Sequence, residues 1–380
     1  MTSVPSSGSR SPKQVILCTF DSLPIAVGES ELWPNFLRLS SLGIRFQRAS
    51  VGHLTATSVV SETVIETGLF PKHLPWQDQW IRDAKGQLGS RGKFHVTRDL
   101  SSTQMHQLLE PTLPLSLRTR VTGKLLGGMR EENSLEGTIN ALSTPEKWSF
   151  LSLHFRGLTA DGADRVLGKI QGVLEFNSLL RNAVLVVTAT HGEAPTLTRG
   201  DPKLLSELLK PSVTTVSLHD SFLRFWTPNA NPVHTARVAA SVRSLPGVIQ
   251  VLTKKNAGSG YHYVRASQAK DLSESTALWL SNDAQTLAET MASASSADVI
   301  AFLQEGTTYA SSAEVSGASP SAQRIPLVIL SPNLRGGGVV SEKPVRLVDI
   351  NPIVARLLGL GEELTLDGSS AAIEPYVAGE

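Results

Sequence analysis

The chain has 380 residues, of which 41% are hydrophobic and 18% are charged, and its formal net charge is +1 at pH 7. This composition is typical of a globular protein with a sizeable core, and it excludes a chain that is disordered over most of its length. The balanced charge, without long blocks of one sign, argues against a nucleic-acid polymer or a membrane surface as the partner.

The N-terminal residues 1–13 are polar and rich in serine and proline, which predicts a disordered tail rather than a signal peptide. No run reaches the ~18 apolar residues of a membrane span. We therefore expect a cytoplasmic protein with no membrane span. The single cysteine, Cys18, excludes an internal disulfide framework and a cysteine-cluster metal site. It lies in the apolar run 15–18, which indicates a buried and unreactive thiol.

Strands and helices alternate along the first half of the chain. The apolar run 14–20 predicts a strand that ends at Asp21. The strands and helices predicted after it are a helix at 33–42, a strand at 44–49, a helix at 57–67, a strand at 94–96, a helix at 101–109, a strand at 148–155, a helix at 164–180 and a strand at 183–189. The last strand is continuously apolar, which is typical of the centre of a parallel sheet. This alternation predicts a βαβ sheet covered by helices on both faces.

The stretch 212–275 has a different pattern. A strand at 217–226 is followed by a helix at 232–243 and by strands at 248–253 and 261–265. We interpret this βαββ block as a small lobe inserted into one domain that spans 14–380. The earlier pattern resumes after it, with segments at 277–280, 284–293, 299–303, 326–330 and 348–358.

Five segments, in the same order along the chain, resemble the alkaline phosphatase superfamily, and most closely its nucleotide pyrophosphatase/phosphodiesterase branch. They are VILCTFD at 15–21, WPNFLRL at 33–39 with GIRF at 43–46, TATSVVSET at 55–63 with TGLFPKH at 67–73, AVLVVTATHG at 183–192, and IPLVI at 325–329 with RLVDINP at 346–352. The resemblance implies an α/β fold with a mostly parallel central sheet sandwiched by helices, and with a small α+β insert.

The resemblance also implies a site with two divalent metals, often zinc, that clamp a phosphoryl group while a threonine or serine hydroxyl attacks it. Aspartate and histidine side chains would bind such metals. Asp21 would bind the first metal, together with His191 and the nucleophile. The nucleophile is Thr57 by residue type or Ser58 by its spacing from Thr67 and Gly68. Each of these residues also has a simpler interpretation, as a turn-forming aspartate, a strand-end histidine or a helix N-cap.

The other metal ligands of the superfamily are missing. Thr190 stands where the resemblance implies an aspartate, and Thr159 and Ala163 stand where it implies an aspartate and a histidine. Val315 lies where it implies a late histidine, and no histidine follows His262. Displaced ligands could come from Asp161, Glu62, His219 or Asp220. We interpret Glu62 as a solvated residue on the surface of its helix.

Three functions remain open. The leading hypothesis is a catalytically impaired or inactive homologue that keeps the fold for a binding, scaffolding or assembly role. An active phosphodiesterase or pyrophosphatase with displaced ligands is the second, and a metal-free anion binder is the third. We expect no cofactor beyond one weakly bound zinc or manganese ion at Asp21 and His191. The expected partners are a phosphate ester and an unidentified protein, such as an intact paralogue.

Overall fold

The computed structural model describes residues 12–24, 31–74, 80–82, 88–90, 117–125, 128–193, 198–201, 203–205, 213, 215–219, 221–309, 317–361 and 366–377. The predicted tail up to residue 11, the predicted strand at 94–96 and the predicted helix at 101–109 lie outside these ranges. So do Asp220, Val315 and the side chain of His219.

The main sheet has seven strands, and its strand order is β17-β2-β16-β8-β1-β7-β6. The bounds are β1 Gln14–Ser22, β2 Ile44–Phe46, β6 Met129–Glu132, β7 Phe150–Phe155, β8 Ala183–His191, β16 Leu327–Leu330 and β17 Val339–Ser341. Strand β16 runs antiparallel to both of its neighbours, while the other pairs are parallel. All nine residues of β8 are buried. The predicted mostly parallel sheet, with a fully buried central strand, is confirmed.

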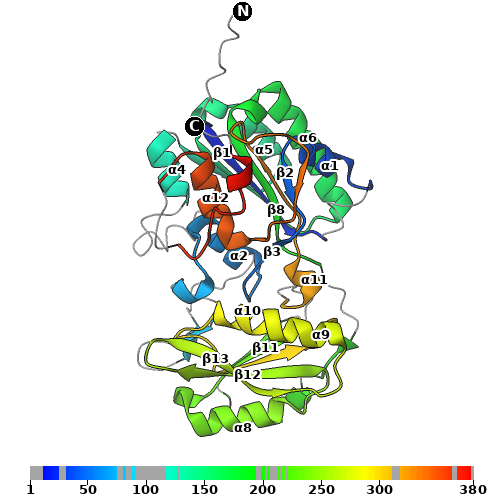
Figure 1. Cartoon of the computed structure of the whole chain (residues 1–380), viewed down its shortest axis with the longest axis vertical. Coiled ribbons are helices and arrows are strands. Elements are labelled where there is room, and N and C mark those ends of the chain that lie inside the picture. The colour runs from blue at the N-terminus through cyan, green and yellow to red at the C-terminus, as the bar shows by residue number, and fades with distance from the viewer. Residues whose placement is uncertain are drawn as a thin grey trace, which may run out of the picture.

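Helices cover both faces of this sheet (Figure 1). Helix α6 (Ala160–Phe176) packs against α1 (Pro34–Ser40) and α5 (Leu135–Leu142), and α2 (Ser58–Thr67) packs against α4 (Leu117–Leu125) and α12 (Ile350–Leu357). Cys18 is buried in β1, next to the central strand β8, and burial raises the pKa of its thiol. The predictions of covered faces and of a buried cysteine are both confirmed. Within the described ranges, no helix is long and apolar enough to span a membrane.

A second, antiparallel sheet lies beside the main domain and has the strand order β10-β11-β14-β12-β13. Its strands are β10 Thr215–His219, β11 Phe222–Trp226, β12 Val248–Asn256, β13 Tyr261–Gln268 and β14 Val299–Leu303. Helix α8 (Pro232–Val242) covers its outer face. Helix α9 (Glu274–Trp279), the π-helical turn η6 (Leu280–Ala284) and α10 (Gln285–Glu289) lie between this sheet and the main domain (Figure 1).

Two details of this second lobe differ from the sequence-based expectation. The predicted strand at 217–226 is a hairpin of β10 and β11, because Ser221 takes a left-handed backbone conformation with φ of 64° and reverses the chain. Strand β14, at 299–303, is the central strand of the second sheet rather than part of the main sheet. The strands of the lobe therefore continue past the predicted boundary at 275.

Side chains from α10 occupy part of the outer edge of β13. The backbone N–H of Tyr263 donates to Glu289 Oε1 at 2.6 Å, and Gln285 Nε2 donates to the carbonyl of Tyr263 at 3.2 Å. An uncovered strand edge presents unpaired backbone groups to other chains. Here both backbone groups of Tyr263 are paired within the chain.

Candidate functional site

Three predicted positions meet at the carboxyl ends of β1 and β8. Ser58, the first residue of α2, donates its hydroxyl hydrogen to the carboxylate of Asp21. Thr190 Oγ1 donates to the backbone oxygen of Asp21 at 2.7 Å and lies 3.2 Å from Ser58 Oγ. Ligands of open α/β sheets bind at this edge of the sheet. Asp21 and Ser58 are therefore in direct contact at the end of the sheet where a ligand site is expected.

Helix α2 is fixed at both ends. Ser61 Oγ donates to the carbonyl of Thr190 at 2.8 Å, which ties the first turn of the helix to β8. At the other end Gly68 takes φ of 67°, and its N–H bonds the carbonyl of Val64. A left-handed C-cap of this kind favours glycine. These contacts hold Ser58 against Asp21.

The loop before α2 is also buried and constrained. Thr55 takes φ of 59°, which is uncommon for a β-branched residue. The side chain of Gln323 donates to the carbonyl of His53 at 3.1 Å, and its backbone oxygen accepts from the N–H of Val51 at 2.8 Å. Burial lowers the pKa of His53 to about 4, so this ring is neutral at physiological pH. The chain therefore enters α2 along a rigid path.

Thr57 precedes α2 in the N-cap position, with φ of −73° and ψ of 149°. Its side chain makes no capping hydrogen bond, and its buried Oγ1 has no hydrogen-bond partner among the described residues. The two candidate nucleophiles thus differ: Ser58 contacts Asp21, whereas the Thr57 hydroxyl is unpaired. An unpaired buried hydroxyl is unfavourable in the folded protein.

We predict that Thr57→Val changes the free energy of unfolding by less than about 0.5 kcal/mol, because the substitution removes no hydrogen bond. The matched control is Thr159→Val. Thr159 caps α6 by accepting from the N–H of Gly162 at 3.2 Å. Loss of such a cap costs about 1 kcal/mol. Urea denaturation followed by circular dichroism measures both values, and equal losses would contradict the assignment of Thr57 as a non-capping residue.

His191 ends β8, and Ser22 lies opposite it in the pairing of β1 with β8. The His191 side chain is buried, and its Nδ1 donates to the carbonyl of Gly192 at 2.9 Å. In the neutral ring this tautomer leaves the lone pair on Nε2, which is the arrangement in which a histidine binds a metal. Asp21 and His191 therefore come from adjacent strands at the same edge of the sheet.

Thr159 and Ala163, which replace the implied metal ligands, and the candidate ligand Asp161 all belong to the start of α6. Thr159 is exposed and caps α6, Ala163 is buried inside that helix, and Asp161 is exposed in its first turn. Among the residues that the structure describes, no group of three or more histidine, cysteine, aspartate or glutamate side chains is placed to hold a metal ion.

The interpretation of Glu62 as a solvated surface residue is wrong. Its side chain is 4% exposed and lies 2.9 Å from His154 Nδ1 and 3.7 Å from the guanidinium of Arg156. Burial lowers the pKa of His154, but attraction and a hydrogen bond from Glu62, with further attraction from Glu131 and Glu66, outweigh burial and raise the pKa above its ordinary value. Sequence analysis missed this histidine. Its only signal was a titratable residue inside the apolar strand β7.

Comparison with known proteins bears on the fold. No protein-family model matches the chain, and no curated protein sequence matches it either. Solved structures do match. Human ectonucleotide pyrophosphatase/phosphodiesterase 5 aligns with a TM-score of 0.63 at 12% identity, over 96% of this chain and 100% of that one. The chain has an alkaline-phosphatase-like fold.

Two murine structures support the same assignment. Murine ectonucleotide pyrophosphatase/phosphodiesterase 5 aligns with a TM-score of 0.65, and its inactive threonine-to-alanine variant in complex with AMP aligns with a TM-score of 0.63. Both are 12% identical to this chain and cover 96% of it and 100% of their own length. At this identity the likeness shows the fold alone, and the expected mostly parallel sheet between helices is confirmed.

Proposed function

We propose that the chain is a phosphodiesterase-like protein of the alkaline phosphatase superfamily that has lost two-metal catalysis and keeps its crevice for a binding or assembly role. Its resemblance in sequence, the matching fold of the pyrophosphatase/phosphodiesterase structures and the composition of the site support this proposal. The ligand we propose is a phosphate ester, and the partner is another protein, such as an intact paralogue.

The observation that carries the proposal is the contact of Thr190 with Asp21 and Ser58. The resemblance implies a metal-binding carboxylate at position 190, but Thr190 has a neutral hydroxyl that donates to the backbone of Asp21. A hydroxyl does not ionise at neutral pH, so it contributes no charge to balance a divalent cation. With Thr159 also in place of an aspartate, one of three implied carboxylates is left. This donor set does not fit a two-metal centre.

One neighbour suggests what such a crevice can still do. The murine variant is described as inactive, and it is in complex with AMP. A protein of this fold can therefore bind a nucleotide in an inactive form. Helix α2 begins beside the Asp21 carboxylate, and backbone N–H groups at a helix start attract anions. We propose the same kind of ligand, a phosphate ester, for this chain.

We predict substoichiometric zinc and manganese in protein purified without chelators, with no turnover of bis-p-nitrophenyl phosphate. Inductively coupled plasma mass spectrometry gives the metal content. Thr190→Asp should raise zinc affinity by restoring a carboxylate beside Asp21, whereas Asp21→Asn should lower it. Two tightly bound metals per chain, together with turnover, would overturn the proposal.

The alternative is an active metal-dependent phosphoric ester hydrolase with displaced ligands. In its favour, the Asp21 carboxylate accepts the hydroxyl hydrogen of Ser58, as a base that activates a nucleophile would. However, Glu62 is already engaged by His154 and Arg156, and Asp161 is exposed in the first turn of α6. Loss of any measured phosphodiesterase activity in Ser58→Ala, with Thr57→Val still active, would favour this alternative.

A further inference from the structure

A cavity of about 450 Å³ lies between the main domain and the second lobe. The main domain contributes residues from the loop after β3 (Ala49–Ser50), from the turn after α2 and from α11 (Pro320–Gln323). The lobe contributes residues from α9, η6 and α10. Cavities between two structural units are common ligand sites. Asp21, Ser58 and His191 do not line this cavity, so it is separate from the crevice considered above.

Aromatic and aliphatic groups form much of its wall. Phe70 comes from the main domain, and Trp279 and Leu287 come from the lobe. The Trp279 ring is held edge-on against Phe302, with 5.7 Å between the ring centroids. The guanidinium of Arg346 lies 5.2 Å from the centre of the Phe70 ring. Each ring therefore has a packing partner within the chain.

The backbone is adapted to this cavity at two places. Gly52 takes φ of 73°, and a Cβ at this position would lie 2.7 Å from the Arg346 side chain. Glycine at this position therefore lets the Arg346 side chain pack directly against the backbone of residue 52. On the lobe side, η6 is a π-helical turn between α9 and α10. Single π-helical turns inside α-helices are frequent at functional sites. This turn places Asp283 in the cavity wall.

The wall carries three cations, Lys72, Arg324 and Arg346, and two carboxylates, Asp283 and Glu289. Arg346 pairs with Asp349 at 3.1 Å, and Glu289 accepts from the backbone of Tyr263. By contrast, Lys72 and Arg324 have no carboxylate within salt-bridge distance among the described residues. Asp283 is exposed at the rim of the cavity, and partial burial raises the pKa of its carboxyl group. Lys72 and Arg324 are thus the cations of the wall that no carboxylate of the described residues pairs with.

We propose that this cavity binds a small organic anion, with an aromatic body against Trp279 and Phe70 and with a carboxylate or phosphate group at Lys72 and Arg324. Rigid aromatic walls with a few convergent polar groups are the usual composition of small-molecule sites. Charge-assisted hydrogen bonds from lysine and arginine hold carboxylate and phosphate groups. This inference does not depend on the function proposed for the Asp21 crevice.

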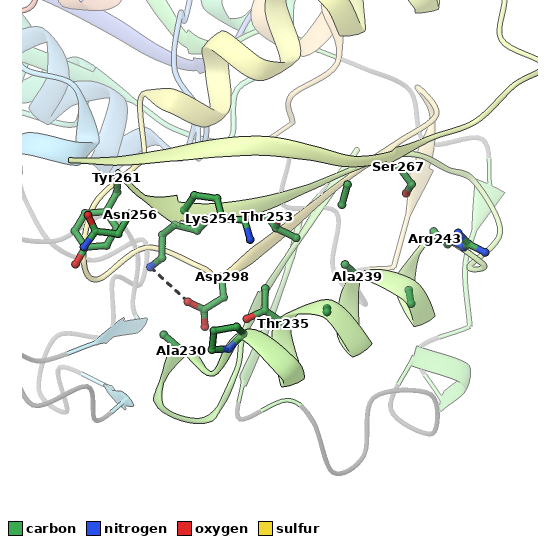
Figure 2. A pocket seen from close by; sticks show the side chains of 15 residues that line it. Ala230, Thr235, Ala239, Arg243, Thr253, Lys254, Asn256, Tyr261, Ser267 and Asp298 are labelled. Carbon is green, nitrogen blue, oxygen red and sulfur yellow. Dashed lines mark ion pairs between the residues drawn. The ribbon is translucent and has the colours of Figure 1, made fainter. Parts of the chain in front are cut away.

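A second large cavity in the described part of the chain is less suited to an aromatic ligand. It has about 490 Å³ and lies in the lobe between α8 and the strands β12 and β13 (Figure 2). Its cations are Lys254, which pairs with Asp298 at 3.5 Å, and Lys255 and Arg243. Its helical wall consists largely of alanine side chains. The cavity between the domain and the lobe, with Phe70 and Trp279 in its wall, therefore offers the better site for an aromatic ligand.

The test uses 8-anilinonaphthalene-1-sulfonate, an aromatic anion whose fluorescence rises in apolar surroundings. The double variant Lys72→Ala with Arg324→Ala should bind it roughly tenfold more weakly, as expected for loss of charge-assisted hydrogen bonds. The matched control, Lys343→Ala with Arg335→Ala, removes two exposed charges elsewhere and should bind like the unchanged protein. Thermal melting followed by circular dichroism confirms that each variant is folded.

Two further measurements complete the test. Thr286→Phe, which fills the cavity from the exposed face of α10, should abolish probe binding. Phenyl phosphate and phenylacetate should displace the probe, while benzyl alcohol should not, and the stronger competitor identifies the anionic group. Equal probe affinity in the cavity variants and the control would overturn the proposal, because the probe would then bind the surface at large.

Discussion

Asp298→Asn is expected to lower the free energy of unfolding by about 3–5 kcal/mol, the usual cost of removing one charge of a buried ion pair. The side chains of Lys254 and Asp298 are 6% and 3% exposed and lie 3.5 Å apart (Figure 2). Removing the carboxylate charge leaves the ammonium group buried without an opposite charge. The backbone carbonyls of Ser293, Ala294 and Ser296, which also accept from Lys254, balance only part of this cost.

The asparagine variant isolates the charge, because its amide oxygen can still accept from the N–H and hydroxyl of Thr227, as Asp298 does at 2.8 and 2.9 Å. Asp271→Asn, at an exposed position, is the matched control and should change stability by less than about 0.5 kcal/mol. Adding Lys254→Met to Asp298→Asn should restore part of the loss. Chemical denaturation followed by circular dichroism measures these values, and a loss no larger than that of the control would contradict the expectation.

Glu62→Gln is expected to destabilise the main domain by a similar amount, about 3–5 kcal/mol at pH values where His154 is charged. The two side chains are 4% and 3% exposed and lie 2.9 Å apart. Glu66 of the same helix and Glu131 of β6 add to the negative potential at His154. The Thr19 and Ser152 hydroxyls each lie 2.8 Å from one of its ring nitrogens.

The sign of the pH dependence follows from the raised pKa of His154 in the folded chain. A raised pKa means that the folded state binds the proton more tightly than the unfolded state does. This stabilisation is fully present below the unfolded histidine pKa of about 6.5, and it is lost as the pH rises through the folded pKa. The native protein should therefore lose stability over that range, and Glu62→Gln should flatten the change.

Denaturation curves at several pH values test this expectation. Glu175→Gln is the control, because its exposed pair with Arg38 contributes about 0–1 kcal/mol. If Glu62→Gln kept the pH dependence of stability of the native protein, Glu62 would not set the pKa of His154.

The main sheet could be predicted because its strands carry a strong local signal. Runs such as 14–20 and 183–189 are continuously apolar, and the structure buries them at the centre of the sheet. Strand β14 has the same apolar character, yet it belongs to the other sheet. Apolarity shows that a strand is buried and gives no information about which partners it takes. The location of β14 depends on its pairing with β11 and β12, which are distant in sequence.

The candidate site was predictable in part for a related reason. Asp21 and Ser58 could be placed at one edge of the sheet because strand ends and helix starts can be located from sequence. The choice between Thr57 and Ser58 depends on the rotation of α2, which the packing of Ser61 on β8 decides. Glu62 looked solvated because its partner, His154, is 92 residues away along the chain; this contact exists only after β7 has joined the sheet.

Helix α10 is one of the links between the lobe and the main domain, beside the hydrogen bonds of Ala318 and Ser319 to Ser221 Oγ. Just beyond it, Thr290 accepts from the N–H of Lys72 at 2.8 Å and its hydroxyl lies 3.3 Å from the N–H of Leu54, both in the main domain. Within it, Glu289 and Gln285 hold the backbone of Tyr263 in the lobe. A movement of the lobe away from the main domain must therefore either break the Thr290 contacts or pull α10 off β13. In the second case the movement would expose a strand edge to neighbouring chains, so the attachment of the lobe and the resistance to aggregation depend on the same short helix.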